Sequence, residues 1–350
     1  MARKSWGLPY MGSKNAIAKD IVNALPKGER LIDLFAGGCA ITDYALKNTD
    51  KFSGFLVNDL NGWSPQAYLK ALAGGFNDEE RWISRRDFFH LLPTDDYVKL
   101  CFSFGNNLKT YLYNPQLEPY KRALHHIIFW EDYEQMKELC PQVVDIMQEY
   151  CKGKDRKGRR LASGYAIADH VKQKNSVEYW KSNPLFRAIK VKWTPERRGM
   201  KSSDTIGSSL SLSSVELDSP KTLQSLESLE RLESLESLER MERMESLRNP
   251  EYASIEISNI SYSDYAYRDG DVVYCDPPYK DTGGYECKFD SNAFWEWVRT
   301  RNYPIYVSEY RAPEDFVSIW NVEKRALFHG ENLTAPKSEH LFIHRKFTNR

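Results

Sequence analysis

The chain has 350 residues, enough to bury a sizeable core in one large or two modest domains. Its 49 basic and 49 acidic residues cancel, so the overall charge says nothing about a polyanionic partner. The six cysteines show neither a CxxC pair nor zinc-ligand spacing, and we expect reduced thiols and no metal site. With no apolar signal core at the start and no apolar run of about 18 residues, we predict a cytoplasmic protein.

The first predicted helix follows a loop over residues 7–14, Gly-Leu-Pro-Tyr-Met-Gly-Ser-Lys. Ser13 or Asn15 is suited to cap this helix, whose apolar positions recur at helical spacing from Ile17 to Leu25, before Pro26. The sequence Gly-Ser-Lys before a helix suits an anion-friendly turn. It is not a P-loop, because the upstream glycine of GxxxxGK is missing.

A strand, a glycine turn and a helix are predicted over residues 30–46. Leu31 and Ile32 have the character of a buried parallel strand, and the helix is expected over residues 40–46. The small residues between them let a ligand approach the backbone at a helix N-terminus. A pyrophosphate site is not indicated, because GxGxxG is absent.

The second predicted strand begins at Gly54 and ends in Asp59, about twenty residues after the glycine turn. An acid at this position is placed to accept hydrogen bonds from both hydroxyls of a ribose. Alternatively, Asp59 caps the helix that follows. Residues 63–130 are then helical and aromatic-rich, with an Asn-Asn break at Asn106 and Asn107.

Residues 152–201 form a strongly basic segment, with fifteen Lys and Arg against four Asp and Glu, a net charge of +11. Aromatic residues such as Tyr165 and Trp180 are interleaved with these charges. Clustered cations neutralise phosphates and aromatic rings stack on bases, so we predict nucleic-acid binding. Residues 152–160 resemble a flexible arm or hairpin over the DNA backbone, with contacts expected from Lys154, Arg156, Lys157, Arg159 and Arg160.

A Ser-rich linker over residues 202–220 precedes a repeat over residues 222–247, in which Leu or Met recurs every three residues. A step of three is 300° in an α-helix, so the apolar positions wind around the cylinder and leave no fixed stripe. Helix is still favoured by the propensities of Leu, Glu, Arg and Met. The hypothesis is that the repeat is an expandable insertion outside the core.

After Pro250 the α/β pattern resumes. A strand is expected over residues 255–260, a helix over 292–301, a further strand over 303–308 and a final edge strand over 341–345.

The stretch over residues 269–280, Asp-Gly-Asp-Val-Val-Tyr-Cys-Asp-Pro-Pro-Tyr-Lys, predicts a short buried strand that two prolines stop. Asp276 and Tyr279 are therefore held at the carboxyl end of a strand, where ligands bind in open α/β sheets. This geometry suits a flat, amine-bearing ring: the carboxylate accepts from the amine, and Tyr279 covers one face. A strand followed by a plain proline turn is the alternative.

Asp-Pro-Pro-Tyr after an apolar strand resembles the catalytic signature of the Dam-like adenine-N6 DNA methyltransferases. Residues 33–38, Asp-Leu-Phe-Ala-Gly-Gly, are similar to the family's cofactor loop, with Cys39 where its last glycine usually lies. Because cysteine is small, we expect the turn to survive. The resemblance covers residues 1–60 and 250–345 well and 95–115 loosely, with a recognition region inserted before the catalytic motif.

The resemblance implies S-adenosylmethionine as cofactor and duplex DNA as partner, with no metal, and we expect a monomer. The implied cofactor-binding residues are Tyr10, Lys14, Asp33, Phe35, Ala36, Gly37, Gly38, Asp59 and Asp264, the last accepting from the adenine amine. Asp276 and the Pro277 carbonyl would accept from N6 of a flipped adenine on which Tyr279 stacks. Asn107 and Lys109 would contact DNA, or else belong to a buried aromatic helix.

The predicted fold is a Rossmann-like methyltransferase sheet with helices on both faces and a mainly helical inserted region. The catalytic domain would comprise residues 1–62 and 250–350, the DNA-recognition region residues 63–204, and the linker and repeat residues 205–249. Two other functions stay open. One is methylation of cytosine N4, RNA adenine or a protein amide, against which Asp276 and the basic segment argue. The other is an inactive nucleic-acid-binding protein.

Overall fold

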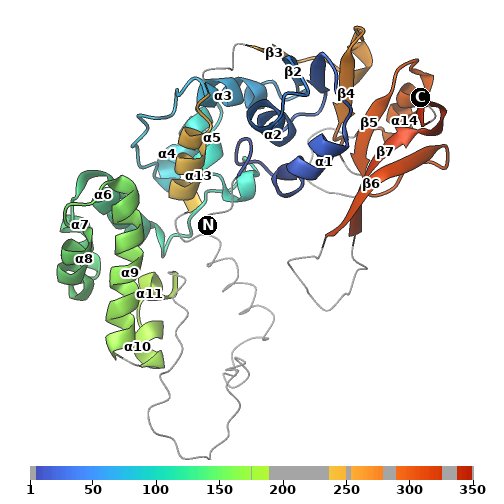
Figure 1. Cartoon of the computed structure of the whole chain (residues 1–350). Coiled ribbons are helices and arrows are strands. Elements are labelled where there is room, and N and C mark those ends of the chain that lie inside the picture. Colours follow the sequence, from blue (N-terminus) through green and yellow to red (C-terminus); the bar gives the residue numbers. More distant parts are fainter. Residues whose placement is uncertain are drawn as a thin grey trace, which may run out of the picture. The chain divides into compact units, whose positions relative to one another are not determined.

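The computed structural model describes residues 5–174, 176–188, 236–249, 254–278, 289–324 and 337–348 (Figure 1). The chain folds into two compact units. Unit 1 comprises residues 1–79, 92–110 and 239–350, and unit 2 comprises residues 80–91 and 111–238. These boundaries differ from the expected ones at 62 and 204, because α3 (Trp63–Leu72) and α5 (Asp96–Phe102) belong to unit 1.

Unit 1 is built on one seven-stranded sheet with the strand order β3-β2-β1-β4-β5-β7-β6. The first five strands in this order are parallel, and β7 is antiparallel to both β5 and β6. This confirms the predicted Rossmann-like methyltransferase fold class. The strands are β1 (Arg30–Asp33), β2 (Gly54–Asn58), β3 (Ile255–Ser258), β4 (Asp271–Cys275), β5 (Ile305–Glu309), β6 (Phe316–Lys324) and β7 (Lys337–His344).

The strand expected over residues 341–345 is part of β7, but the prediction that it lies at the edge of the sheet is wrong. Strand β7 pairs with β5 on one side and β6 on the other, so β6 is the edge. The sequence did not reveal β6, because an irregularity between Ser318 and Trp320 shifts the alternation of apolar and polar residues that identifies a half-buried strand.

One face of the sheet is covered by α14 (Ser291–Thr300), which Asp290 caps by accepting from Asn292 N and Ala293 N. Phe294 and Val298 of this helix pack with Val273 of β4 in one apolar cluster. Burial of each such side chain contributes roughly 1.5–3 kcal/mol. The other helical elements of unit 1 are η1 (Lys14–Ala16), α1 (Ala18–Ala24), α2 (Ala40–Asn48), η2 (Phe104–Asn106), η5 (Tyr262–Asp264) and η6 (Arg345–Phe347).

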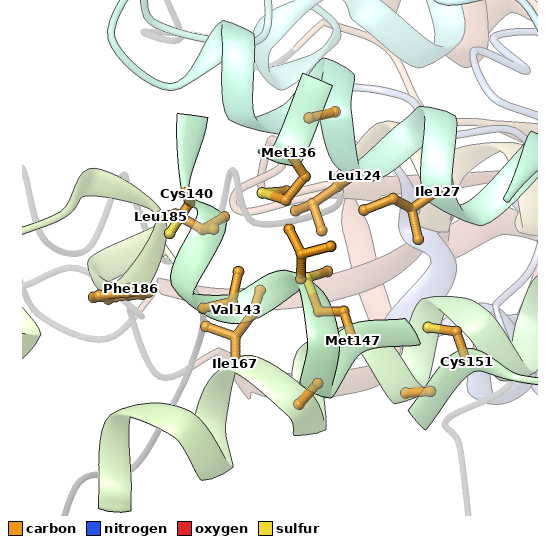
Figure 2. Packing of buried hydrophobic residues seen from close by; sticks show 14 of the residues in the cluster. Leu124, Ile127, Met136, Cys140, Val143, Met147, Cys151, Ile167, Leu185 and Phe186 are labelled. Carbon is orange, nitrogen blue, oxygen red and sulfur yellow. The ribbon is translucent and has the colours of Figure 1, made fainter. Parts of the chain in front are cut away.

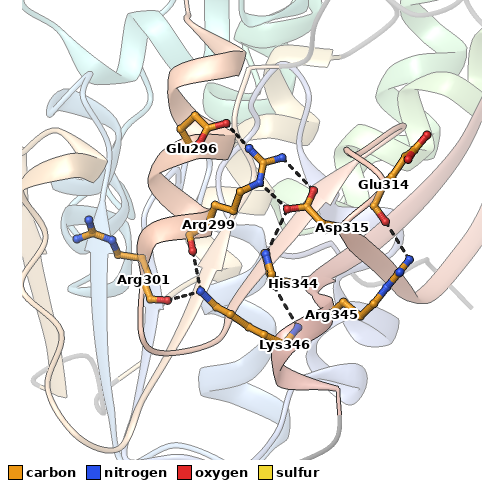
Figure 3. A network of polar contacts seen from close by, with 8 residues as sticks. All are labelled: Glu296, Arg299, Arg301, Glu314, Asp315, His344, Arg345 and Lys346. Atoms are coloured by element: carbon orange, nitrogen blue, oxygen red, sulfur yellow. Dashed lines mark hydrogen bonds and ion pairs between the residues drawn. The ribbon is translucent and has the colours of Figure 1, made fainter.

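A polar network fastens the end of α14 to the C-terminal part of the sheet (Figure 3). Lys346 Nζ donates to the carbonyls of Arg299 and Arg301, at 2.6 and 2.7 Å, which supplies a cation to the helix C-terminus. The Arg299 guanidinium binds Asp315, and this contact holds the pKa of that carboxyl at about 2. His344 Nε2 lies 3.2 Å from the same carboxylate.

The end of the period-three repeat is packed into the protein, which contradicts the hypothesis that the repeat lies outside the core. Helix α13 (Glu236–Ser246) is formed, as its residue propensities predict. The side chains of Met241, Met244 and Leu247 are each exposed by 3% or less. Arg240 donates to the carbonyls of Leu100 and Ser103. Residues 222–235 lie outside the described residues.

Unit 2 consists of helices around an apolar core that includes Leu124, Ile127, Met136, Met147 and Ile167 (Figure 2). The mainly helical character predicted for the inserted region agrees with this. The elements are α4 (Arg85–Leu91), α6 (Glu118–Trp130), α7 (Glu134–Leu139), η3 (Pro141–Val143), α8 (Val144–Cys151), α9 (Arg156–Lys174), α10 (Val177–Lys181) and α11 (Pro184–Ala188). In the described parts of the chain, no helix is long and apolar enough to cross a membrane.

The expected arm or hairpin at residues 152–160 is instead a short turn over residues 152–155 followed by the first turn of α9. Asp155 begins the helix: its side chain accepts from Gly158 N at 2.7 Å, and its carbonyl accepts from Arg159 N. Lys and Arg favour helix, so an N-cap acid followed by a basic run was the overlooked signal.

Candidate active site

A cavity of about 360 Å³ opens at the carboxyl ends of β1, β2 and β4. Parallel strands bring their carboxyl ends to one edge of a sheet, and this is where the sequence motifs of unit 1 meet. The cavity is lined by most of the described residues that were predicted to contact the cofactor or the acceptor. They are Tyr10, Lys14, Asp33, Phe35, Ala36, Gly37, Gly38, Asp59 and Asp276.

The turn between β1 and α2 keeps its shape with cysteine in the expected glycine position. Cys39 is buried and adopts a left-handed conformation, with φ 60° and ψ 29°, which glycine would adopt without strain. Its backbone N–H donates to the Ala36 carbonyl at 2.6 Å and closes the turn. The expected survival of this turn is therefore confirmed.

The N-terminal segment lies directly on the glycine turn. Leu8 N donates to the Gly38 carbonyl at 2.7 Å. A Cβ on Gly38 would lie 2.5 Å from the Cβ of Tyr10, so only glycine permits this approach. Ser13, one of the two residues predicted to cap the first helix, is the N-cap of η1, and its Oγ accepts from Asn15 N at 3.3 Å.

Asp59 is held beside the glycine turn by two backbone donors. Gly37 N donates to Oδ2 and Asn61 N to Oδ1, both at 2.8 Å. Burial raises the pKa of Asp59, and these two hydrogen bonds oppose the shift. A carboxylate has about four acceptor positions, so Asp59 keeps capacity for ligand hydroxyls.

Asp33 ends β1 with an acceptor that has no protein donor among the described residues. Its Oδ2 accepts from Thr42 Oγ1 at 3.0 Å, whereas Oδ1 is buried without a hydrogen bond. Burial raises the pKa of Asp33 to about 7, with Asp276 and Asp59 adding repulsion. A buried, unsatisfied oxygen at a cavity wall suits a cationic or hydrogen-donating ligand group.

Asp276 forms an ion pair with Lys14 immediately after β4. Lys14 Nζ lies 2.8 Å from Asp276 Oδ1, and Lys14 is 7% exposed. Burial acts to lower the pKa of Lys14, but the Asp276 and Glu339 carboxylates raise it above its ordinary value, so Lys14 stays cationic. Pro277 is buried and Pro278 lines the cavity, whereas Tyr279 lies outside the described residues.

The wall opposite the glycine turn differs from expectation. Asp264 is exposed and is not among the residues that line the cavity, because it ends the short η5 turn whose preceding residues, Ser261 and Tyr262, face the cavity. Asp290, the cap of α14, is the carboxylate that lines this wall. The adenine contact expected of Asp264 stays a prediction.

Aromatic rings make the apolar part of the same wall. Phe35 lies against Tyr262, with ring centroids 5.6 Å apart, and against Phe289 at 5.8 Å. Asn58, which the sequence analysis did not single out, ties the strand ends together. Its amide donates to the Leu34 and Ile260 carbonyls at 2.9 and 3.1 Å.

Of the two predicted DNA-contacting residues near residue 108, Asn107 shapes the chain. Its side-chain oxygen accepts from Lys109 N and Thr110 N, each at 2.9 Å, in a tight turn. Lys109 itself is exposed in this turn.

The predicted DNA-binding cations of unit 2 divide into exposed and structural groups. Lys154 and Lys157 are exposed, and Arg156 and Arg160 are half-buried. Arg159 is different: it donates to the Ile128 carbonyl at 2.7 Å and to Glu131 Oε1 at 2.6 Å. The guanidinium of Arg159 therefore fastens α9 to the end of α6, and the DNA contact expected of it stays a prediction.

Comparison with known families found a match over part of the chain. Residues 10–173 match the model of a family described as D12 class N6 adenine-specific DNA methyltransferase. This part of the chain is therefore similar to that family. A search of curated proteins found no matching relative. The matched residues include the glycine turn, Asp33, Asp59 and nearly all of α9, but not the strand that precedes Asp276.

The donor set of the cavity fits S-adenosylmethionine, the cofactor that methyltransferases of the matched family typically use. The orphaned oxygen of Asp33 suits an ammonium group, and Asp59 suits ribose hydroxyls. Among the described residues, no group of three or more His, Cys, Asp and Glu is arranged to hold a metal ion.

Proposed function

We propose that this protein is a site-specific DNA methyltransferase that transfers the methyl group of S-adenosylmethionine to N6 of a flipped-out adenine in duplex DNA. The observation that carries the proposal is the Asp276 carboxylate, which lines the same cavity as Asp33 and Asp59 at the end of β4. The family match supports adenine in DNA as the acceptor.

Four parts of unit 1 would hold the cofactor. Asp33 would accept from its ammonium group and Asp59 from its ribose hydroxyls, while Phe35 and Tyr10 provide apolar contact. When bound, S-adenosylmethionine supplies a methyl group made electrophilic by its sulfonium. The backbone at Gly37 and Gly38 lets the ligand come close to the start of α2.

Asp276 would orient the acceptor nitrogen. The N6 lone pair of adenine is delocalised into the ring, so the amine is a weak nucleophile. The Asp276 carboxylate and the Pro277 carbonyl would accept its two N–H bonds, which makes the nitrogen more tetrahedral and directs its lone pair. Lys14 fixes the carboxylate by binding Oδ1 at 2.8 Å.

An adenine inside a duplex cannot reach such a cavity, so it must leave the base stack. We place the stacking partner at Tyr279, as the sequence motif suggests. The exposed cations Lys154 and Lys157 of unit 2 would neutralise phosphates and hold the duplex.

The test is incubation of the full chain with S-adenosylmethionine carrying a tritiated methyl group and mixed-sequence duplex DNA, followed by nucleoside analysis. We expect label in N6-methyldeoxyadenosine for the wild type and its loss in Asp276→Ala. The matched control is Asp50→Ala, an exposed acid after α2, which should retain the wild-type rate.

Other outcomes redirect the assignment. Label in N4-methyldeoxycytidine, or label only in RNA or protein, would replace the acceptor while leaving the methyltransferase chemistry in place. Absence of cofactor binding by calorimetry would contradict the proposal and favour a nucleic-acid-binding protein.

A further inference from the structure

Acidic side chains from neighbouring strands gather around the Lys14 ammonium. Strands β4 and β5 are parallel, so both carboxyl ends lie at the cavity edge of the sheet. Strand β7 is antiparallel to β5, so its amino end lies at that same edge. The topology therefore brings together Asp276 after β4, Glu309 at the end of β5 and Glu339 near the start of β7.

Glu339 shares Lys14 with Asp276. Its side chain is fully buried, and its Oε1 lies 3.7 Å from Lys14 Nζ. The strand register explains this meeting. Ser308 of β5 pairs in register with Leu341 of β7. The Ser308 hydroxyl also lies 2.8 Å from the Tyr274 hydroxyl, so the side chains of Ser308, Leu341 and Tyr274 lie on one face of the sheet. Glu339 and Asp276 lie two residues from Leu341 and Tyr274, and alternation places them on the same face.

Glu309 and Tyr310 complete the surroundings of Lys14. Glu309 pairs in register with His340 and so points to the other face of the sheet, where its Oε1 accepts from Tyr310 N at 2.7 Å. Burial raises the pKa of Glu309 to about 7, and Asp276 and Glu339 add repulsion. Glu309 is thus partly protonated at neutral pH.

The Lys14 ammonium lies between two carboxylates. A buried carboxylate is costly unless it has a cationic partner, and Lys14 Nζ lies 2.8 Å from Asp276 Oδ1 and 3.7 Å from Glu339 Oε1. Glu339 therefore helps to hold the ammonium group that Asp276 binds.

We propose that Glu339 is a positioning residue for methyl transfer, which anchors Lys14 against Asp276 and so fixes the carboxylate that faces the acceptor nitrogen. This inference rests on the proposed function. As the nitrogen lone pair forms the N–C bond, the C–S bond breaks and sulfur keeps its electron pair. The nitrogen is cationic until one proton is released to solvent, and a preorganised Asp276 carboxylate stabilises that state.

The experiment compares single-turnover methylation by the full chain in the wild type, Glu339→Gln, Glu339→Asp and, as a control, Glu323→Gln on the exposed side of β6. We expect Glu339→Gln to lower the rate by roughly 10- to 100-fold, below the loss typical of a directly contacting group. The cofactor dissociation constant and the thermal midpoint should change little. Glu339→Asp, which keeps the charge, should retain more of the rate, and Glu323→Gln all of it.

A second readout does not depend on activity. In protein labelled with ¹³C-lysine, NMR should show that the pKa of Lys14 falls in Glu339→Gln, because one of the two carboxylates that raise it is removed. No shift of the Lys14 titration, or equal rates for wild type and Glu339→Gln, would overturn the inference. If the wild type itself methylated no adenine, the proposed function would fail, while the NMR titration would still decide whether Glu339 sets the charge of Lys14.

Discussion

At the scale of single residues, the environment of the cavity sets the protonation of Asp33. Its pKa in the folded chain is about 7, against an ordinary value of 3.8, and burial is the main cause. Between these two pH values the folded state holds a proton that the unfolded state has released. Stability is therefore lost as pH rises through this interval, and the penalty is complete above pH 7.

Replacement of Asp33 by asparagine should remove this penalty while the side-chain oxygen still accepts from Thr42. We expect the ligand-free Asp33→Asn protein to gain stability over the wild type at pH 8, by at most about 4 kcal/mol, and to gain little at pH 4. Urea unfolding at both pH values measures this, with Asp50→Asn as the exposed control. An equal gain at the two pH values would contradict the assignment.

Cys39 permits a test of backbone strain. Because its φ is 60°, both Cys39→Ala and Cys39→Gly lose the buried sulfur, but only the glycine variant also relieves the left-handed conformation. We expect Cys39→Gly to be more stable than Cys39→Ala by about 1 kcal/mol, the reverse of their order in an ordinary helix. Urea unfolding of the two variants decides it, and a more stable alanine variant would show that the turn relaxes.

At the scale of elements, α13 connects the end of the repeat to the N-terminal segment. Arg243 donates to the carbonyls of Trp6 and Gly7. A Cβ on Gly7, whose φ is +66°, would lie 2.2 Å from the Gly38 carbonyl oxygen. The helix thus braces the N-terminal segment at the point where that segment packs on the glycine turn.

Loss of the Arg243 hydrogen bonds should change ligand binding in the cavity, although Arg243 does not line it. We expect Arg243→Ala to weaken S-adenosylmethionine binding by about tenfold, since hydrogen bonds from a charged donor contribute about 1.5–3 kcal/mol. Isothermal titration calorimetry measures the change, and Arg248→Ala, at the exposed end of the same segment, is the control. Unchanged affinity in Arg243→Ala would show that the N-terminal segment holds its place alone.

At the scale of the whole molecule, a strongly basic segment lies within unit 2. The chain is neutral overall, yet its residues 152–201 carry +11. Of this segment, α9 presents Lys157 and Lys172 to solvent, whereas Arg159 is committed to α6. The proposed function therefore predicts DNA affinity mainly in unit 2 and cofactor affinity in unit 1.

This division predicts separable effects. In the double variant Lys157→Ala and Lys172→Ala, we expect the slope of log affinity for DNA against log salt to fall by about two, one for each lost phosphate contact. S-adenosylmethionine affinity should stay constant. Fluorescence anisotropy at several salt concentrations measures the slope, with Lys137→Ala, whose ammonium pairs with Glu134 at 2.7 Å, as the control. If the slope in the double variant equalled that of the wild type, DNA would bind to a different surface.

The sequence by itself determined the features that depend on neighbouring residues. The strand and turn before α2, the acids at the ends of β1 and β2, and the proline stop after β4 were predicted, because apolar alternation and turn residues act over a few positions. Since parallel strands share an edge, the meeting of Asp33, Asp59 and Asp276 at one cavity followed from the same patterns.

Only the tertiary structure decided which side chains become partners. Lys14 binds Asp276 across 262 positions of sequence, and Glu339 joins them because β7 is inserted antiparallel between β5 and β6. Likewise, the basic run contains no local sign that Arg159 would bind carbonyls of α6, and a period of three does not show which leucines are buried. Periodicity reports a buried face, but the partner of that face is set by strand register and packing between distant segments.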